Sequence, residues 1–182
     1  LNKEHQSIEF IRIGTSGTIR EDIAIDSTVV SAYAIGLDGL LNFYEDKGVR
    51  NKALEDIFHS ATAISSPYAV EASEKLVTKF KPLGLAGITT TATGFYGPQS
   101  RNIRLQAKYQ LPSLLADVRY NNLKFTNLEM ETAGIYGLGK LLGHEAISIN
   151  AILANRVNGA FSSNPAKTID KLIRNTLEVI VS

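Results

Sequence analysis

The sequence predicts an α/β fold in which helices pack against a largely parallel or mixed β-sheet. Strand-like runs alternate with amphipathic helical segments along the chain, which is the order expected for such layers. One run, Glu145–Ala154, is almost continuously apolar, as is typical of a strand buried on both faces. The 182 residues, 44% of them hydrophobic, suffice for a core. Because no repeat or linker interrupts the pattern, we expect residues 1–182 to form a single domain.

The predicted strands are short runs rich in apolar and β-branched residues. Between them, stretches rich in Gly, Pro, Asn and Asp predict loops at Gly36–Arg50 and Ala92–Arg101. The first strand run ends in the four residues Gly14–Gly17, for which one interpretation is a tight glycine turn. The strands are expected at Ile8–Ile13, Thr28–Ile35, Leu85–Thr91 and Glu145–Ala154, with Phe125–Met130 extended or irregular.

Helices are predicted where apolar residues recur at helical spacing between start and stop signals. Pro67 near the start of one segment and Gly84 after it mark its limits, and Gly143 stops another. The C-terminal helix has Asn164 as its N-cap and Pro165 at its first position. Its apolar side is expected to comprise Ile169, Leu172, Ile173, Leu177 and Ile180. The other helices are expected at Asn51–Ala61, Pro67–Phe80, Ser113–Tyr120 and Glu131–Leu142.

The composition excludes several classes of function. With 19 Lys and Arg against 18 Asp and Glu, the formal charge of +1 argues against a nucleic-acid binder. The absence of cysteine excludes disulfides, thiol nucleophiles and Cys-ligated metals, and the histidines lack ligand spacing, so we expect no metal site. No run is long and apolar enough to span a bilayer and no signal-peptide pattern is visible. These features predict a cytoplasmic protein with no nucleic-acid or membrane partner.

The first candidate site segment is Arg12-Ile13-Gly14-Thr15-Ser16-Gly17, at the end of a predicted strand. Its glycines allow a ligand to approach the backbone, its hydroxyls are hydrogen-bond donors, and Arg12 supplies a fixed positive charge. This combination suits a phosphate. The alternative is a strand with an outward-facing Arg followed by an ordinary glycine turn. The segment is not a Walker loop, because no Lys follows the glycines.

A second candidate segment, Thr89–Arg101, runs from a hydroxyl-rich strand end into an aromatic pair and then Gln99 and Arg101. In an extended segment, residues two apart point the same way, so an amide and a guanidinium would face one ligand. Their donors and acceptors match the edge of a planar heterocycle bearing carbonyls and an N–H, and Phe95 is available to stack on it. The alternative is a solvated surface loop.

Two further segments place polar side chains where strands end. In Asn127–Ala133, Glu129 and Glu131 flank Met130, a pattern that suits sugar hydroxyls with an apolar wall. Alternatively, Glu131 only interacts with the helix dipole. Arg156 directly follows the buried strand and lies near the expected ligand crevice, or it is a surface charge.

Together, the segments FIRIGTSG, GFYGPQSR, NLEMETAG and ILANR resemble the uridine phosphorylase branch of the nucleoside phosphorylase family. Their order and spacing agree from about Glu9 to the C-terminus. The resemblance implies a three-layer α/β/α fold around a twisted mixed β-sheet. It also implies reversible phosphorolysis of uridine to uracil and ribose 1-phosphate, with inorganic phosphate as co-substrate and no cofactor. Assembly into a homodimer or homohexamer is implied as well.

The resemblance assigns roles residue by residue. Phosphate would be held by Arg12, Gly14 and Thr15. The nucleoside would be bound by Phe95, Gln99, Arg101, Glu129, Met130, Glu131, Leu153, Ala154 and Arg156.

Gln99, Arg101 and Glu131 would carry the catalysis. Cleavage of the N-glycosidic bond builds positive charge on the sugar and negative charge on the departing base. Gln99 and Arg101 would stabilise the negative charge, and the Glu131 carboxylate would fix the sugar through its hydroxyls.

Three alternatives stay open: a purine nucleoside phosphorylase, a nucleoside hydrolase of the same fold, and a non-catalytic nucleoside-binding homologue. The purine enzymes of the family resemble one another in an Asp at the strand exit, which supports a proton on the leaving purine. Here the strand exit reads Ala154-Asn155-Arg156, and an amide cannot deliver a proton. Uridine is therefore favoured over inosine, whereas thymidine and 2′-deoxyuridine are not separated from uridine by any residue.

The start of the chain predicts a larger protein. The first residue is Leu1 rather than Met, and a strand is predicted within ten residues of it. The resembled family also carries an earlier segment, with a Gly-rich turn and an Arg that complete the phosphate site. Nothing in Leu1–Phe10 matches that segment. We therefore expect these residues to be roughly the C-terminal two-thirds of a longer domain.

Overall fold

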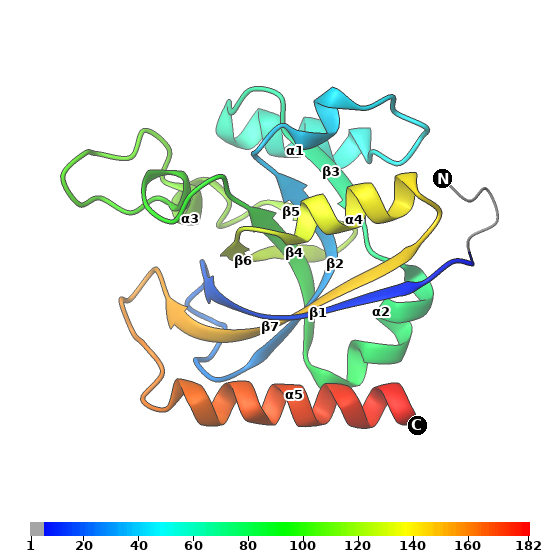
Figure 1. Ribbon diagram of the computed structural model, residues 1–182. Coiled ribbons are helices and arrows are strands. Elements are labelled where there is room, and N and C mark those ends of the chain that lie inside the picture. The colour runs from blue at the N-terminus through cyan, green and yellow to red at the C-terminus, as the bar shows by residue number, and fades with distance from the viewer. Residues whose placement is uncertain (1–5) are drawn as a thin grey trace.

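The computed structural model describes residues 6–182 and shows a mixed β-sheet covered by helices on both sides (Figure 1). This is the three-layer α/β/α fold that the resemblance implies. The strands are β1 (Glu9–Thr18), β2 (Thr28–Gly36), β3 (Tyr68–Glu71), β4 (Leu85–Thr91), β5 (Arg119–Tyr120), β6 (Leu123–Glu129) and β7 (Glu145–Asn155). The helices are α1 (Lys52–Thr62), α2 (Glu74–Phe80), α3 (Leu111–Leu114), α4 (Thr132–Leu141) and α5 (Pro165–Val181), with 3-10 turns η1 (Leu40–Phe43), η2 (Lys81–Leu83) and η3 (Gly97–Gln99).

The strand order is β1-β7-β2-β4-β6-β5, with β3 added to β2. β7 lies parallel to β1 and antiparallel to β2, and β4 lies parallel to both β2 and β6. β1 also pairs antiparallel with β6, through Gly17 opposite Leu128 and Thr18 opposite Asn127. Because of this second pairing, β1, β7, β2, β4 and β6 close into a ring, and their end strands are not left as free edges.

Apolar clusters fix a layer of helices on each face of the sheet. On one side, Leu76 and Phe80 of α2 and Leu172 of α5 pack against β7. On the other side, Leu54 and Phe58 of α1 pack in a cluster with strand residues, and α4 contributes a neighbouring cluster. Figure 1 shows the long α5 running beneath the sheet and α1 and α4 above it. β7 is buried along most of its length, as its apolar sequence predicts.

Between the strands lies a buried polar network that consists of Ser31, Thr89, Asn127, Ser148 and Asn150. Each of these residues is fully buried. The Ser31 and Thr89 hydroxyls lie 2.6 Å apart, and Thr89 Oγ1 donates to Asn127 Oδ1 over 2.9 Å. Asn150 Nδ2 donates to Ser31 Oγ over 3.1 Å and to Ser148 Oγ over 3.2 Å. A network with these bonds avoids the cost of buried, unpartnered polar groups and specifies one arrangement of the strands.

Two predicted elements are wrong because long-range pairing overrides local pattern. The segment Pro67–Phe80 is not one helix: its first part forms β3, which pairs antiparallel with β2. Ser73 then caps the shorter α2 by accepting a hydrogen bond from the Leu76 N–H. Likewise, the predicted helix Ser113–Tyr120 is replaced by the short α3 and by β5, which pairs with β6.

The first strand extends beyond its predicted end at Ile13, because β1 continues through Gly14–Gly17 to Thr18 in parallel register with β7. The C-terminal helix begins as predicted, with the Asn164 side chain accepting from the Lys167 N–H over 3.1 Å. Its apolar side is only partly used, since Leu172 is buried whereas Ile173, Leu177 and Ile180 are exposed.

The Tyr136 hydroxyl of α4 replaces backbone hydrogen bonds between β2 and β7 at the point where their pairing ends. The antiparallel pairing of these strands stops at Val30 opposite Ile149. At the next position the buried phenol donates to the Ser31 carbonyl and accepts from the Ser148 N–H, each over 2.7 Å. Two strands that diverge are thus joined through a helix.

We expect Tyr136→Phe to lower the free energy of unfolding by about 1–3 kcal/mol, because two buried backbone groups lose their partner. Urea denaturation followed by circular dichroism measures the change. Tyr33→Phe is the control, since the Tyr33 hydroxyl accepts only from Asn121 at an exposed position. Equal stability of Tyr136→Phe and the wild type would show that the phenol does not join the strands.

Candidate functional site

A pocket of about 660 Å³ opens where β1, β6 and β7 meet. Gly17 of β1 lies opposite both Leu128 of β6 and Ala154 of β7, so three strand ends converge there. Strand ends of α/β sheets are the usual location of ligand sites, and the volume is in the range of small-molecule pockets. The lining residues are Arg12, Ile13, Gly14, Thr15, Ser16, Gly17, Phe95, Gln99, Arg101, Leu128, Glu129, Met130, Glu131, Leu153, Ala154, Arg156 and Phe161.

Every site residue named from the sequence lines this pocket. The four segments are separated by up to 144 positions in the chain (Arg12 to Arg156), yet they surround one cavity. Phe161 also lines the pocket but was not predicted; it is an exposed side chain in the loop after β7, and its backbone bridges to Ala154. The only sequence signal for it is an aromatic residue placed soon after a strand exit. Ile13, Ser16, Gly17 and Leu128 also line the pocket; they belong to the candidate segments, although the resemblance assigns them no individual role.

Arg12 lies at the centre of the polar side of the pocket, with its side chain 15% exposed. Its Nη1 donates to Asn150 Oδ1 over 2.8 Å and to Ser148 Oγ over 3.1 Å. Its Nη2 donates to Glu131 Oε2 over 2.5 Å and lies 3.2 Å from Glu129 Oε2. The guanidinium is therefore held between two neutral acceptors on β7 and two carboxylates at the end of β6 and the start of α4.

Gly14 and Gly17 make room for arginine side chains. A Cβ at Gly14 would lie 2.1 Å from Arg12 Nη1, and a Cβ at Gly17 would lie 2.8 Å from Arg156 Nε. Both distances are shorter than van der Waals contact, so any side chain there would displace an arginine. The glycine spacing in this segment thus reflects the packing of Arg12 and Arg156 on β1, and not a tight turn.

Glu129 is buried, and its carboxylate accepts several hydrogen bonds from neighbouring backbone and hydroxyl groups. Its Oε2 accepts from the N–H groups of Glu131 and Thr132 and from the Thr132 hydroxyl, at 2.8–3.0 Å. Its Oε1 accepts from the Thr91 hydroxyl over 2.5 Å. With both oxygens engaged by the protein, Glu129 organises the start of α4 and offers little to a ligand. This geometry differs from the role in nucleoside binding that the resemblance implies for it.

Glu131 differs from Glu129 although it is only two residues away. Its side chain is 56% exposed, and it makes no side-chain cap at the α4 N-terminus. Its carboxylate instead pairs with Arg12 at the pocket wall. Met130 between them is also partly exposed and lines the pocket. The carboxylate of Glu131 is therefore the one placed to accept bonds from ligand hydroxyls.

Gln99, Arg101 and Arg156 form a second polar group in the pocket. Gln99 is buried, and its Oε1 accepts a hydrogen bond from Arg156 Nη2. Arg101 lies 3.4 Å from the centroid of the Phe95 ring and donates to the Phe95 carbonyl over 2.8 Å. One face of Phe95 thus carries a cation–π contact.

Gln99 and Arg101 do not face the pocket through strand alternation, and the prediction of an extended segment is wrong. The segment is not extended: Gly97–Gln99 is a 3-10 turn and Ser100 is left-handed, with φ of 61°. Both side chains reach the pocket because the turn folds back, not because they alternate along a strand.

Both arginines of this group are partly removed from water. Burial, followed by the positive charge of Arg101, lowers the pKa of Arg156 to about 10. Burial also lowers the pKa of Arg101. Arg156 Nε is buried without a hydrogen-bond partner among the described residues. Two cations with incomplete partners in one pocket favour a ligand that carries carbonyl oxygens or negative charge.

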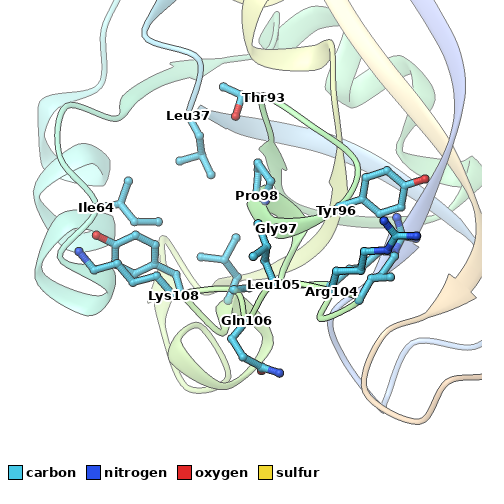
Figure 2. A pocket seen from close by; sticks show the side chains of 15 residues that line it. Leu37, Ile64, Thr93, Tyr96, Gly97, Pro98, Arg104, Leu105, Gln106 and Lys108 are labelled. Carbon is cyan, nitrogen blue, oxygen red and sulfur yellow. The ribbon is translucent and has the colours of Figure 1, made fainter.

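A larger pocket of about 790 Å³ lies beside this site, with Arg101 lining both. Figure 2 shows Leu37 and Ile64 on one side of it and Pro98, Gly97 and Leu105 facing them. Its walls are mainly aliphatic and aromatic, and it lacks the converging carboxylates and glycines of the strand-end pocket. The strand-end pocket is therefore the candidate functional site.

Within residues 6–182, no group of three or more His, Asp or Glu side chains is placed to hold a metal ion. In the same part of the chain, no helix combines the length and apolar character needed to cross a bilayer.

A family model described as the phosphorylase superfamily matches residues 1–181. The chain belongs to the phosphorylase superfamily. The match extends over nearly the whole sequence and agrees with the resemblance that the four motifs carry.

Known relatives and solved structures of this superfamily include proteins of two substrate classes. A uridine phosphorylase of Thermococcus kodakarensis is 30% identical over 153 residues, covering 84% of this chain and 50% of the relative. A DeoD-type purine nucleoside phosphorylase of Buchnera aphidicola is 25% identical over 177 residues, covering 95% and 64%. A nucleoside phosphorylase structure from Trypanosoma brucei, described as showing uridine phosphorylase activity, matches with a TM-score of 0.85 at 24% identity, covering 95% and 63%. The chain thus spans about half to two-thirds of the length of these proteins.

The separate roles of the two carboxylates lead to a stability prediction. We expect Glu129→Gln to lower the free energy of unfolding by about 3 kcal/mol, because an amide cannot accept all of these buried bonds and leaves Arg12 less compensated. Glu131→Gln should change it by no more than about 1 kcal/mol, because that ion pair is half exposed. Urea denaturation of the two variants gives the comparison. Equal losses in both would contradict the assignment of Glu129 as the structural carboxylate.

Proposed function

We propose that the protein catalyses the reversible phosphorolysis of uridine to uracil and ribose 1-phosphate. Membership of the phosphorylase superfamily supports this class of reaction. The observation that carries the proposal is that one pocket holds both Arg12 with Glu131 and Gln99 with Arg101. The first pair suits phosphate and a sugar, and the second suits the edge of a pyrimidine.

Phosphate binds at the β1 side of the pocket. Arg12 supplies the positive charge, and Thr15, exposed in the same strand, supplies a hydroxyl. Gly14 contributes by leaving space for the Arg12 guanidinium. A guanidinium held in a fixed plane matches the oxygens of a phosphate.

The nucleoside fills the rest of the pocket. Gln99 and Arg101 contact the uracil carbonyls and N3, with Arg156 fixing the Gln99 amide from behind. Glu131 accepts from the ribose hydroxyls. Phe95, Met130, Leu153 and Ala154 supply the apolar walls.

In the reaction, a phosphate oxygen attacks C1′ of the ribose as the C1′–N1 bond breaks. The bonding electron pair leaves with uracil, and a proton from water neutralises the uracil anion. Gln99 and Arg101 stabilise the negative charge that develops on the base. The phosphate dianion stabilises the positive charge on the sugar, which Glu131 holds in position. This chemistry requires no metal or redox cofactor.

Purine phosphorolysis is the second candidate, because relatives of the DeoD type also match the chain. The leaving purine would need a proton donor at the exit of β7. Asn155 occupies this position, and its side chain bonds to the protein instead: Nδ2 donates to the Arg20 carbonyl, and Oδ1 accepts from the Val157 N–H, each over 2.9 Å. This geometry favours the pyrimidine substrate.

The proposal is tested by incubating the full-length protein with uridine, with and without phosphate, and measuring uracil by chromatography. Uracil formed only in the presence of phosphate is the expected result. Release without phosphate would identify a hydrolase, and hypoxanthine formed from inosine in place of uracil from uridine would identify a purine enzyme. No release from either nucleoside would point to a non-catalytic binding protein. Cytoplasmic location and assembly as a homodimer or homohexamer stay predictions.

We expect Arg101→Ala to reduce uridine turnover by a factor of at least about 100, because the charge on the departing uracil loses its cationic partner. Phosphate affinity, measured by calorimetry, should stay close to that of the wild type. Arg104→Ala is the matched control, since Arg104 lines only the larger neighbouring pocket. If Arg101→Ala abolished phosphate binding and spared uridine binding, the two subsites would have to be exchanged.

Glu131→Gln should strengthen phosphate binding severalfold in the absence of nucleoside. The Glu131 carboxylate pairs with Arg12 over 2.5 Å and therefore competes with any anion for it. The same variant should lower kcat/KM for uridine at least tenfold, because the amide is a weaker acceptor for the ribose hydroxyls. Calorimetry and steady-state kinetics give the two readouts, with Glu178→Gln on the outer surface of α5 as control. Weaker phosphate binding in Glu131→Gln would contradict the competition.

A further inference from the structure

We propose that Asn150, assisted by Ser148, is a positioning residue that holds Arg12 in the orientation that binds phosphate. This inference rests on the proposed function, because it takes Arg12 as the phosphate ligand. Both residues lie on β7, directly beside β1, where Arg12 is opposite Ser148 and Gly14 is opposite Asn150. Neither side chain lines the pocket, so both act through Arg12.

The contacts fix one end of the guanidinium completely. Nη1 carries two hydrogens, and the bonds to Asn150 Oδ1 at 2.8 Å and Ser148 Oγ at 3.1 Å use both of them. Because the guanidinium is planar, fixing Nη1 in this way also sets the direction of Nη2. Nη2 then lies at the pocket wall, within reach of Glu131.

The acceptors on β7 are neutral, and this distinguishes them from the carboxylates on the other side. Glu129 and Glu131 attract Arg12 but also cancel its charge, which weakens its attraction for an anion. An amide oxygen holds the guanidinium without adding a negative charge. Asn150 therefore opposes the pull of the carboxylates and preserves the positive potential that phosphate needs.

Asn150 is itself held in one orientation. It is fully buried, and its Nδ2 donates to Ser31 and Ser148, so its oxygen has to face Arg12. Gly14 keeps the path between Asn150 and the pocket clear, since a Cβ there would overlap Arg12 Nη1. The buried polar network thus extends from the strands of the sheet to the phosphate ligand, and it removes rotamer freedom that Arg12 would otherwise lose on binding.

The test compares Asn150→Leu with the wild type in the full-length protein. The variant should raise the Kd for inorganic phosphate, measured by calorimetry without nucleoside, about tenfold, because Arg12 loses a charge-assisted bond and turns towards the carboxylates. The KM for uridine should stay within about twofold. Ser148→Ala, a smaller change at the second acceptor, should weaken phosphate binding about threefold and serves if Asn150→Leu does not fold.

Two controls distinguish a loss of Arg12 orientation from a general destabilisation of the protein core. Thr89→Val removes hydrogen bonds from the same buried polar network without touching Arg12, and should leave the Kd for phosphate unchanged. In an Arg12→Met background, which removes the guanidinium, Asn150→Leu should have no further effect on the Kd.

Several results would overturn the inference. They are wild-type phosphate affinity in Asn150→Leu, an equal loss in Thr89→Val, or an undiminished effect of Asn150→Leu in the Arg12→Met background. Absence of phosphate binding in the wild type would overturn both this inference and the proposed function. A protein that binds phosphate but releases no uracil would refute only the proposed function, since the binding measurements test Asn150 without turnover.

Discussion

The Arg12 guanidinium is the group on which the rest of the pocket depends. It joins β7, through Asn150 and Ser148, to the end of β6 and the start of α4, through Glu129 and Glu131. A charged group at 15% exposure is stable only if its partners are in place, so these elements and the guanidinium fix one another. Because Gly14 has no side chain, the arginine can lie along its own strand.

The closed ring of strands explains how the pocket is assembled. Because Gly17 pairs with both Leu128 and Ala154, the ends of β1, β6 and β7 meet at one point. Near this point, hydrogen bonds of the buried polar network and of the Tyr136 hydroxyl join the strands where the backbone pairing of β2 with β7 has ended. Elements that stabilise the sheet therefore also hold the residues that line the pocket.

The two neighbouring glutamates have different roles: one stabilises the fold, and the other is the carboxylate that we propose to bind the ligand. Glu129 and Glu131 stand in one short motif, and their residue type alone implies similar roles. Their burial differs: Glu129 is buried and accepts from three backbone or hydroxyl groups at the α4 N-terminus, whereas Glu131 is half exposed and pairs with Arg12. Arg156 and Arg101 show the same division, because Arg156 orients Gln99 while Arg101 stacks on the exposed Phe95.

The α/β class, the buried character of β7 and the N-cap of the C-terminal helix could be predicted from the sequence, because they follow from periodicity and capping chemistry. Most residues of the pocket could be predicted from four short motifs and the family that they resemble. Three features became visible only in the folded chain: Tyr68–Glu71 is a strand, Gly14–Gly17 continues β1, and Gln99 and Arg101 converge through a 3-10 turn. The folded chain alone also revealed Asn150 and Ser148 beneath Arg12, 138 and 136 positions away in the chain. Such contacts depend on strand register and on the space that glycine leaves, and neither is encoded in a local pattern.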